Sequence, residues 1–139
     1  MILLDTNVVS EPTKPQPNSD VLQWLDRQSA ESLAFSATSL SEVLAGVEIL
    51  LDGKRKENLR SVLHGLIRLL FEDRVIAFDH LAAMEYARVV AQARGNGYAI
   101  SVSDAQIAAI AAVHGFSVAT RDTAPFIAAG VPVIDPWQL

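Results

Sequence analysis

Short apolar runs typical of β-strands alternate along this chain with longer helical patterns, and this alternation limits the possible folds more than any other feature. The runs are "MILLD", "SLAFSAT", "RVIAFD", "FSVAT" and "VPVID", at residues 1–5, 32–38, 74–79, 116–120 and 131–135. Strands separated by helices predict an α/β fold with a parallel sheet. A chain of 139 residues, half of them hydrophobic, can bury its own core, so we expect one three-layer domain spanning 1–139.

Six segments between and after these runs have helical patterns: 21–28, 41–53, 55–73, 80–97, 101–115 and 123–130. The segment at 55–73 is amphipathic, with leucines and a valine on one side and Arg and Lys opposite. Gly53 and Gly115 are the expected helix stops. The Pro-rich stretch "EPTKPQPNSD" disfavours a helix and predicts a turn.

Composition excludes several classes of protein. The chain has no cysteine, so a metal site would have to use oxygen or imidazole ligands. We expect a cytoplasmic protein without a membrane segment, because no apolar stretch is long enough to span a bilayer and "MILLDTN" lacks the features of a signal peptide. The net charge of −5 gives no overall basic surface for phosphates, which argues against a simple nucleic-acid binder.

Four acids lie where strands end or helices begin. Asp5 follows the first run, Asp122 follows the fourth, and Glu42 and Asp104 fall in the first turns of expected helices. Ligand sites of parallel sheets form outside the carboxyl ends of the strands, so the four acids could share one edge. Each also has a structural explanation: Ser39 with Glu42 and Ser101 with Asp104 fit capping boxes, Asp122 could cap a helix near Pro125, and Asp5 could form an Asx turn.

Convergence of the four carboxylates would require compensation. Two unit charges about 4 Å apart repel by roughly 4 kcal/mol at an effective dielectric near 20. Either some pKa values rise or a cation binds. An oxygen-only set without nearby histidine favours Mg²⁺ or Mn²⁺, and such an ion can activate water and stabilise the charge on a phosphate in transfer.

Other polar residues beside these acids have open assignments. Thr6, Asn7 and Thr120 could contact a phosphate or a water at the site, or they could only cap turns. Arg121 could pair with Asp122 or contact a phosphate. His64, His80 and His114 are scattered and are expected to be surface or core residues rather than ligands.

The motifs "LLDTNVVSEP", "TSLSEVLAGV", "SVSDAQIAAIA", "VATRD" and "VIDPW", taken in order, resemble PIN-domain ribonucleases. They are similar to the toxins of bacterial VapBC-type pairs, and most of all to the FitB subgroup. The resemblance covers nearly the whole chain. It implies a PIN-like fold, in which a parallel sheet of order 3-2-1-4-5 lies between helices.

The resemblance also implies a function and partners. Asp5, Glu42, Asp104 and Asp122 would form an acidic pocket that holds Mg²⁺ or Mn²⁺ and cuts RNA. Asp5, Asp104 and Asp122 would hold the ion, while Glu42 would orient or deprotonate water. A homodimer is implied, silenced by an antitoxin that carries a small DNA-binding domain, and the complex would assemble on operator DNA.

One departure affects Asp122. Many relatives read "TRN" and carry a further acid three residues later, whereas "TRDTAPF" has Asp122 in the asparagine place and Pro125 in the place of the later acid. The FitB subgroup shares Asp122, so the fourth acid is shifted. Whether Asp122 touches the ion directly or through water stays open.

Two other functions are compatible with parts of the pattern. The chain could be a PIN-fold binding module with weak chemistry, using the Pro-rich stretch and the helix at 55–73 as contact surfaces. An aspartyl phosphotransferase fits less well: one type needs a second Asp where Asn7 stands, and the other needs a lysine that "VATRDT" lacks.

Overall fold

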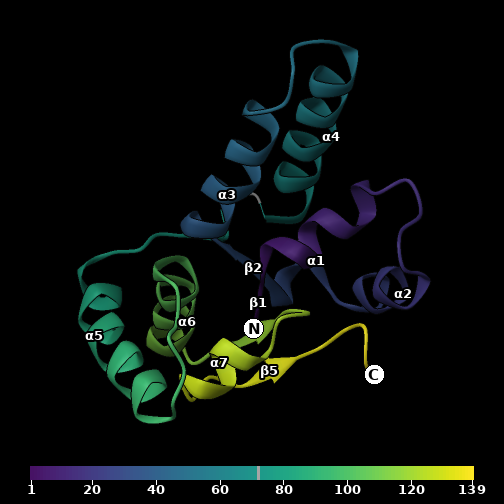
Figure 1. Cartoon of the computed structure of the whole chain (residues 1–139). Coiled ribbons are helices and arrows are strands. Elements are labelled where there is room, and N and C mark those ends of the chain that lie inside the picture. The colour runs from purple at the N-terminus through teal and green to yellow at the C-terminus, as the bar shows by residue number, and fades with distance from the viewer. Residues whose placement is uncertain (72) are drawn as a thin grey trace.

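The computed structural model describes residues 1–71 and 73–139, and the sheet at its centre is entirely parallel (Figure 1). Its strands in this part of the chain are β1 (Ile2–Leu4), β2 (Leu33–Ser36), β3 (Val75–Ile76), β4 (Ser117–Ala119) and β5 (Val133–Ile134). Their order is β3-β2-β1-β4-β5, which confirms the predicted 3-2-1-4-5 arrangement. The first strand of the sequence is therefore the central strand of the sheet.

The register of the three inner strands fixes the position of the first acid. Leu4, the last residue of β1, pairs with Phe35 of β2 and with Ala119 of β4. The N–H of Asp5 then donates to the Ala119 carbonyl at 2.9 Å. Asp5 is thus attached to the sheet at the edge where the parallel strands end.

Helices cover both faces of the sheet, because successive strand residues point to opposite sides. Leu3, Ala34 and Val118 face one cluster of buried residues, whereas Leu4, Phe35 and Ala119 face another. The first face carries α5 (His80–Gly95), α6 (Val102–His114) and α7 (Ala124–Ala128) (Figure 1). The second carries α1 (Thr6–Ser10), α2 (Ser19–Arg27), α3 (Ala37–Glu48) and α4 (Lys54–Phe71). The predicted three-layer α/β architecture is confirmed.

Two α-helix starts and two short 3₁₀ helices differ from the sequence prediction. The residues after Asp5 form α1 rather than a turn. The 3₁₀ helix η1 (Glu11–Thr13) lies in the Pro-rich stretch where a turn was expected, and η2 (Ala30–Ser32) was not predicted. Helix α3 begins at Ala37, inside the run expected to be a strand, because the Ser36 hydroxyl accepts the N–H of Ser39 at 2.9 Å. A capping box of Ser39 and Glu42 is therefore wrong: Ser36 is the cap, and Glu42 lies in the second turn.

Other helix ends agree better with the sequence. Helix α6 begins as predicted, since the N–H of Asp104 donates to the Ser101 hydroxyl at 3.1 Å, and it ends at Gly115 with a left-handed φ of +68°. Asp122 is not the cap of α7, whose N-cap residue is Thr123. The predicted helix at 55–73 is described as α4 up to Phe71, and its residue 72 lies outside the described residues. Within the described chain, no helix is long and apolar enough to cross a membrane.

Candidate active site

Asp5 is a buried carboxylate with a fixed orientation. Its side chain is 7% exposed. One oxygen, Oδ1, accepts the N–H of Thr6 at 2.8 Å, which makes Asp5 the N-cap of α1. The other, Oδ2, accepts the Thr120 hydroxyl at 2.8 Å. The structural explanation expected for Asp5 was an Asx turn; the structure makes it a helix cap instead, and that role accounts for only one of its two oxygens.

Glu42 reaches the same edge of the sheet from α3. The Thr6 hydroxyl donates to its Oε1 at 3.3 Å, and the Ser103 hydroxyl donates to its Oε2 at 3.1 Å. These donors come from α1 and α6, two helices on opposite faces of the sheet. The side chain of Glu42 is exposed, yet both of its oxygens are engaged.

Asp104 and Asp122 complete the set. Asp104 lies in the first turn of α6, partly buried and next to Ser103. Asp122 is exposed and follows β4, where its N–H donates to the Thr120 hydroxyl at 3.1 Å. We refer to Asp5, Glu42, Asp104 and Asp122 as the acid cluster.

Burial and neighbouring charges of the acid cluster change the protonation of two of its members, Asp5 and Asp104. Burial raises the pKa of the Asp5 carboxyl above its ordinary range; hydrogen bonds from Thr120 and Thr6 oppose this rise, and the charges of Asp104 and Glu42 add to it. Burial also raises the pKa of Asp104, against a hydrogen bond with Ser101, and the charges of Asp122 and Glu42 raise it further. The cluster is thus a region of concentrated negative potential.

Thr120 connects several of these groups. Its side chain is fully buried, and its single hydroxyl proton is used in the short bond to Asp5. Its oxygen accepts from Asn7 Nδ2 at 3.3 Å as well as from the N–H of Asp122. Asn7 in turn accepts the N–H of Arg121 at 3.3 Å. Thr6, Asn7 and Thr120 therefore all lie at the acid cluster, as the sequence suggested.

The Arg121 side chain contacts an aromatic ring. Its guanidinium carbon lies 5.4 Å from the centre of the Trp137 ring, a distance typical of a cation–π contact. It also lies near Glu11, a buried carboxylate: burial would raise the pKa of Glu11, but bonding to Lys14 and to the N–H of Asn18, with the charges of Lys14 and Arg121, lowers it below its ordinary range. Arg121 forms no ion pair with Asp122 among the described residues.

Ser103 is the residue of the site that sequence reasoning missed. Two serines occur in "SVSD", and only Ser101 has the spacing of a capping box with Asp104. The partner of Ser103 is Glu42, 61 positions earlier in the chain. The one available signal was its position directly before a candidate acid.

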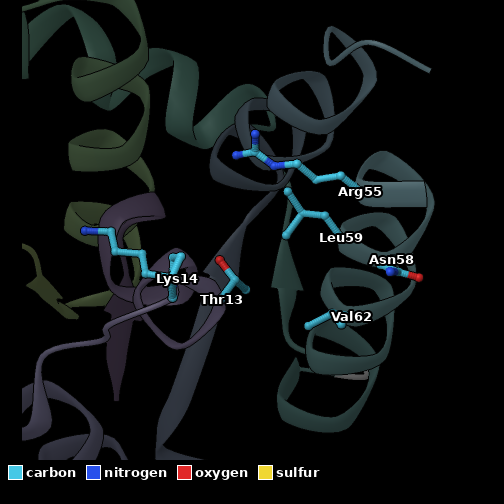
Figure 2. Close-up of a pocket in the computed structure, with 7 residues that line it drawn as sticks. Thr13, Lys14, Arg55, Asn58, Leu59 and Val62 are labelled. Carbon is cyan, nitrogen blue, oxygen red and sulfur yellow. The ribbon is translucent and has the colours of Figure 1, made fainter. Parts of the chain in front are cut away.

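A sizeable pocket of the described residues lies elsewhere, between η1 and α4 (Figure 2). Its volume is about 670 Å³, and it is lined by Thr13, Lys14 and Pro15 on one side and by Arg55, Asn58, Leu59 and Val62 of α4 on the other. No member of the acid cluster lines it. The candidate chemistry therefore lies at an open edge of the sheet, and this pocket is a separate surface.

A parallel sheet of this order with carboxylates where its strands end defines a class of nuclease-like α/β domains. Residues 2–131 match the model of the PIN domain, so the chain belongs to the PIN-domain family.

Relatives match over nearly the full length. The plasmid stability protein StbB of Pseudomonas syringae pv. tomato is 47% identical over 138 residues, toxin FitB of Neisseria gonorrhoeae is 46% identical, and VapC ribonuclease Y4jK of Sinorhizobium fredii is 44% identical; each alignment covers 99% of both chains.

Solved structures agree with these matches. The FitAcB structure from Neisseria gonorrhoeae has a TM-score of 0.94 at 46% identity and covers 100% of both chains. A structure of FitAB bound to an IR36 DNA fragment has a TM-score of 0.95 at 45% identity, with 100% of this chain and 97% of the other covered.

Proposed function

We propose that this chain is a metal-dependent endoribonuclease that acts as the toxin of a toxin–antitoxin pair. The observation that carries the proposal is the acid cluster at the carboxyl edge of the sheet, in a chain whose relatives include a toxin and a ribonuclease. Four carboxylates drawn from separate elements have no common structural task, since only Asp5 and Asp104 take part in helix starts.

The chemistry of the acid cluster fits a hard divalent cation, Mg²⁺ or Mn²⁺. The four groups of the acid cluster all present oxygen, and the chain has no cysteine. Among the described residues, no three acid or histidine side chains are already arranged as ligands of one metal ion. Asp5, whose two oxygens are already oriented, would hold the ion together with Asp104 and Asp122 once the latter two side chains turn toward it. Bound there, the ion would activate water and neutralise charge on the scissile phosphate.

The chain's own residues would orient the acids, act on the attacking water and contact the substrate. Thr120 and the N–H of Thr6 keep both oxygens of Asp5 directed, so the buried acid does not need to reorganise. Glu42 would orient the attacking water or accept its proton, because it is exposed at the cluster and a carboxylate is a competent general base. Thr6, Asn7, Thr120 and Arg121 support the acids or contact the substrate.

The partners follow from the relatives. A structure of FitAB bound to a DNA fragment has been solved, and toxin FitB aligns with this chain over almost the whole length of both. For this chain we infer an antitoxin with a small DNA-binding domain, a homodimer of the toxin, assembly of the complex on operator DNA, and action in the cytoplasm on RNA.

Cleavage of RNA by the purified chain tests the enzymatic proposal. We expect the parent to cut single-stranded RNA in Mg²⁺ and to stop when the ion is chelated, while Asp5→Asn and Asp104→Asn lose at least about a hundredfold in rate. Asp26→Asn, which changes an exposed acid of α2, is the matched control and keeps the parent rate. Equal cutting by Asp5→Asn, Asp104→Asn and the parent would show that the roles are assigned to the wrong residues.

A second candidate function, a binding module with weak chemistry, is favoured by the pocket between η1 and α4 (Figure 2). Leu59 and Val62 give it an apolar wall and Arg55 adds positive charge, whereas the Lys14 ammonium pairs with Glu11 at 2.8 Å. This lining suits an amphipathic acidic peptide of the antitoxin. Val62→Asp should weaken antitoxin binding and leave RNA cleavage intact. Growth arrest that persists after all four acids are replaced would favour binding over cutting.

A further inference from the structure

We propose that Ser103, together with Thr6, is a positioning residue that holds the Glu42 carboxylate in the orientation required for cleavage. The inference rests on the proposed function and deepens it, because it assigns a role to a residue outside the acid cluster. The contacts that carry it are the two hydroxyl bonds to Glu42, one to each oxygen.

Glu42 needs such support because it is exposed. A solvent-exposed glutamate side chain has several rotatable bonds and samples many rotamers. Here the Ser103 hydroxyl donates to Oε2 at 3.1 Å and the Thr6 hydroxyl donates to Oε1 at 3.3 Å. Because the donors belong to α6 and α1, which are fixed on opposite faces of the sheet, the carboxylate is held from two directions.

The direction of each bond also suits the role. A serine or threonine hydroxyl has one proton to donate, and an ionised carboxylate only accepts. Both hydroxyls are thus committed as donors to Glu42, while each carboxylate oxygen has remaining lone pairs for a further donor such as water. The pair orients Glu42 without using up its capacity to accept a proton.

A second hydrogen bond between α3 and α6 makes it possible to test whether Ser103 positions Glu42 or only joins the two helices. The Thr38 hydroxyl of α3 donates to Oε1, the side-chain amide oxygen, of Gln106 in α6 at 3.0 Å. Thr38 precedes Glu42 by four residues, and Gln106 follows Ser103 by three, so both bonds lie on the same facing sides of the helices. If Ser103 only joined α3 to α6, loss of either bond would have the same effect.

Single-turnover and steady-state cleavage of RNA by the full chain in Mg²⁺ gives the first test. Ser103→Ala is expected to lower kcat about tenfold with little change in KM, which is the scale of losing one hydrogen bond to a charged group. Ser103→Thr keeps the hydroxyl and should recover most of the rate. Gln106→Ala removes the neighbouring bond and should leave kcat unchanged. Thr6→Val should behave like Ser103→Ala, and Thr6→Ser should recover.

A double-mutant cycle in the metal-free chain gives a readout independent of activity. Unfolding by urea is measured for Ser103→Ala, Glu42→Ala and the double variant. We expect the effect of Ser103→Ala on the unfolding equilibrium constant to vanish in the Glu42→Ala background, while the effect of Gln106→Ala persists there.

Several outcomes would overturn the positioning role: equal losses of kcat in Ser103→Ala and Gln106→Ala, a full rate in Ser103→Ala, no rescue by threonine, or additive effects in the cycle. Asp5→Asn is run in the same assay. If it cuts like the parent, the proposed function itself fails; if it is inactive while Ser103→Ala is fully active, only the positioning role fails.

Discussion

At the scale of single residues, the site depends on which acids have neighbours that fix them. Asp5 has donors on both oxygens, and the adjoining Thr120 hydroxyl is fully buried. The sequence predicted the four acids from their expected places after strands and in helix starts. In the structure the charges of Asp104 and Glu42 act on Asp5, and those of Asp122 and Glu42 act on Asp104. The sequence could not predict the role of Ser103 or the Arg121–Trp137 contact, because both depend on contacts between segments far apart in the chain.

Replacing Thr120 by valine keeps the side-chain shape and removes the hydroxyl. Asp5 then loses a 2.8 Å bond, and the donors of Asn7 and Asp122 lose their acceptor. We expect a loss of about 1–3 kcal/mol in the free energy of unfolding and a lower rate of RNA cleavage. Urea unfolding and a cleavage assay measure the two effects. Thr120→Ser is the control and should restore both; a stable, fully active valine variant would contradict the argument.

The raised pKa values of Asp5 and Asp104 predict a pH dependence for the metal-free chain. A carboxyl whose pKa is higher in the folded than in the unfolded state contributes stability below its unfolded pKa, near 4, and loses it as pH rises through the folded pKa. The Asp5→Asn/Asp104→Asn double variant lacks this contribution. It should therefore gain stability relative to the parent as pH rises from about 4 to 7.

Urea midpoints for parent and double variant across that pH range, without divalent ions, measure the difference. Glu11 changes stability with pH in the opposite sense, because its pKa is lowered, but it is present in both proteins and cancels. A difference between the two proteins that stays constant with pH would show that these carboxyls titrate as they do in the unfolded chain.

At the scale of elements, the sequence predicted the strands and long helices better than the short helices. The five strand runs all contain observed strands, because apolar residues between helical patterns are a strong signal. Helix α1 has only five residues and no amphipathic period, so its start depends on the Asp5 cap rather than on a pattern. The sequence predicted too late a start for α3, because Ser36 and Ser39 are both acceptable N-caps. In the folded chain the cap is Ser36.

Helix α6 is packed by small side chains. Ala105, Ala108, Ala109 and Ala111 are all fully buried, and the helix packs closely beside α5 (Figure 1). Ala108→Leu adds volume where none is free, so we expect a loss of about 1–3 kcal/mol in the free energy of unfolding. Denaturant unfolding measures it. The control is Ala91→Leu on the exposed side of α5, which should change stability by less than about 0.5 kcal/mol.

At the scale of the whole molecule, charge sets how RNA can be bound. The chain has a net charge of −5, and its acid cluster is negative.

That residues 1–139 form a single domain stays a prediction, as does the number of copies in the active assembly.

We expect binding of single-stranded RNA to depend weakly on monovalent salt. The 11 lysines and arginines are outnumbered by 16 acids, so we expect few of them to contact phosphates and release counterions. The slope of log K against log salt should therefore be smaller in magnitude than about 2 at fixed Mg²⁺. Fluorescence anisotropy with the Glu42→Gln chain, which lacks the proposed base but keeps the three proposed ion ligands, measures this slope. A steep slope would reveal a basic RNA-binding surface and would contradict an attraction that runs mainly through the cation.

The central place of β1 has a consequence for how the protein is made. Strand β1 is synthesised before both of its neighbours: β2 on one side and β4, residues 117–119, on the other. Asp104 and Asp122 also follow β1 by about a hundred residues or more. A nascent chain therefore cannot assemble its carboxylates until residue 122 has been translated, and parallel pairing between distant segments is slow to form. A ribosome producing this protein would carry a polypeptide that stays inert until β4 and Asp122 have been added.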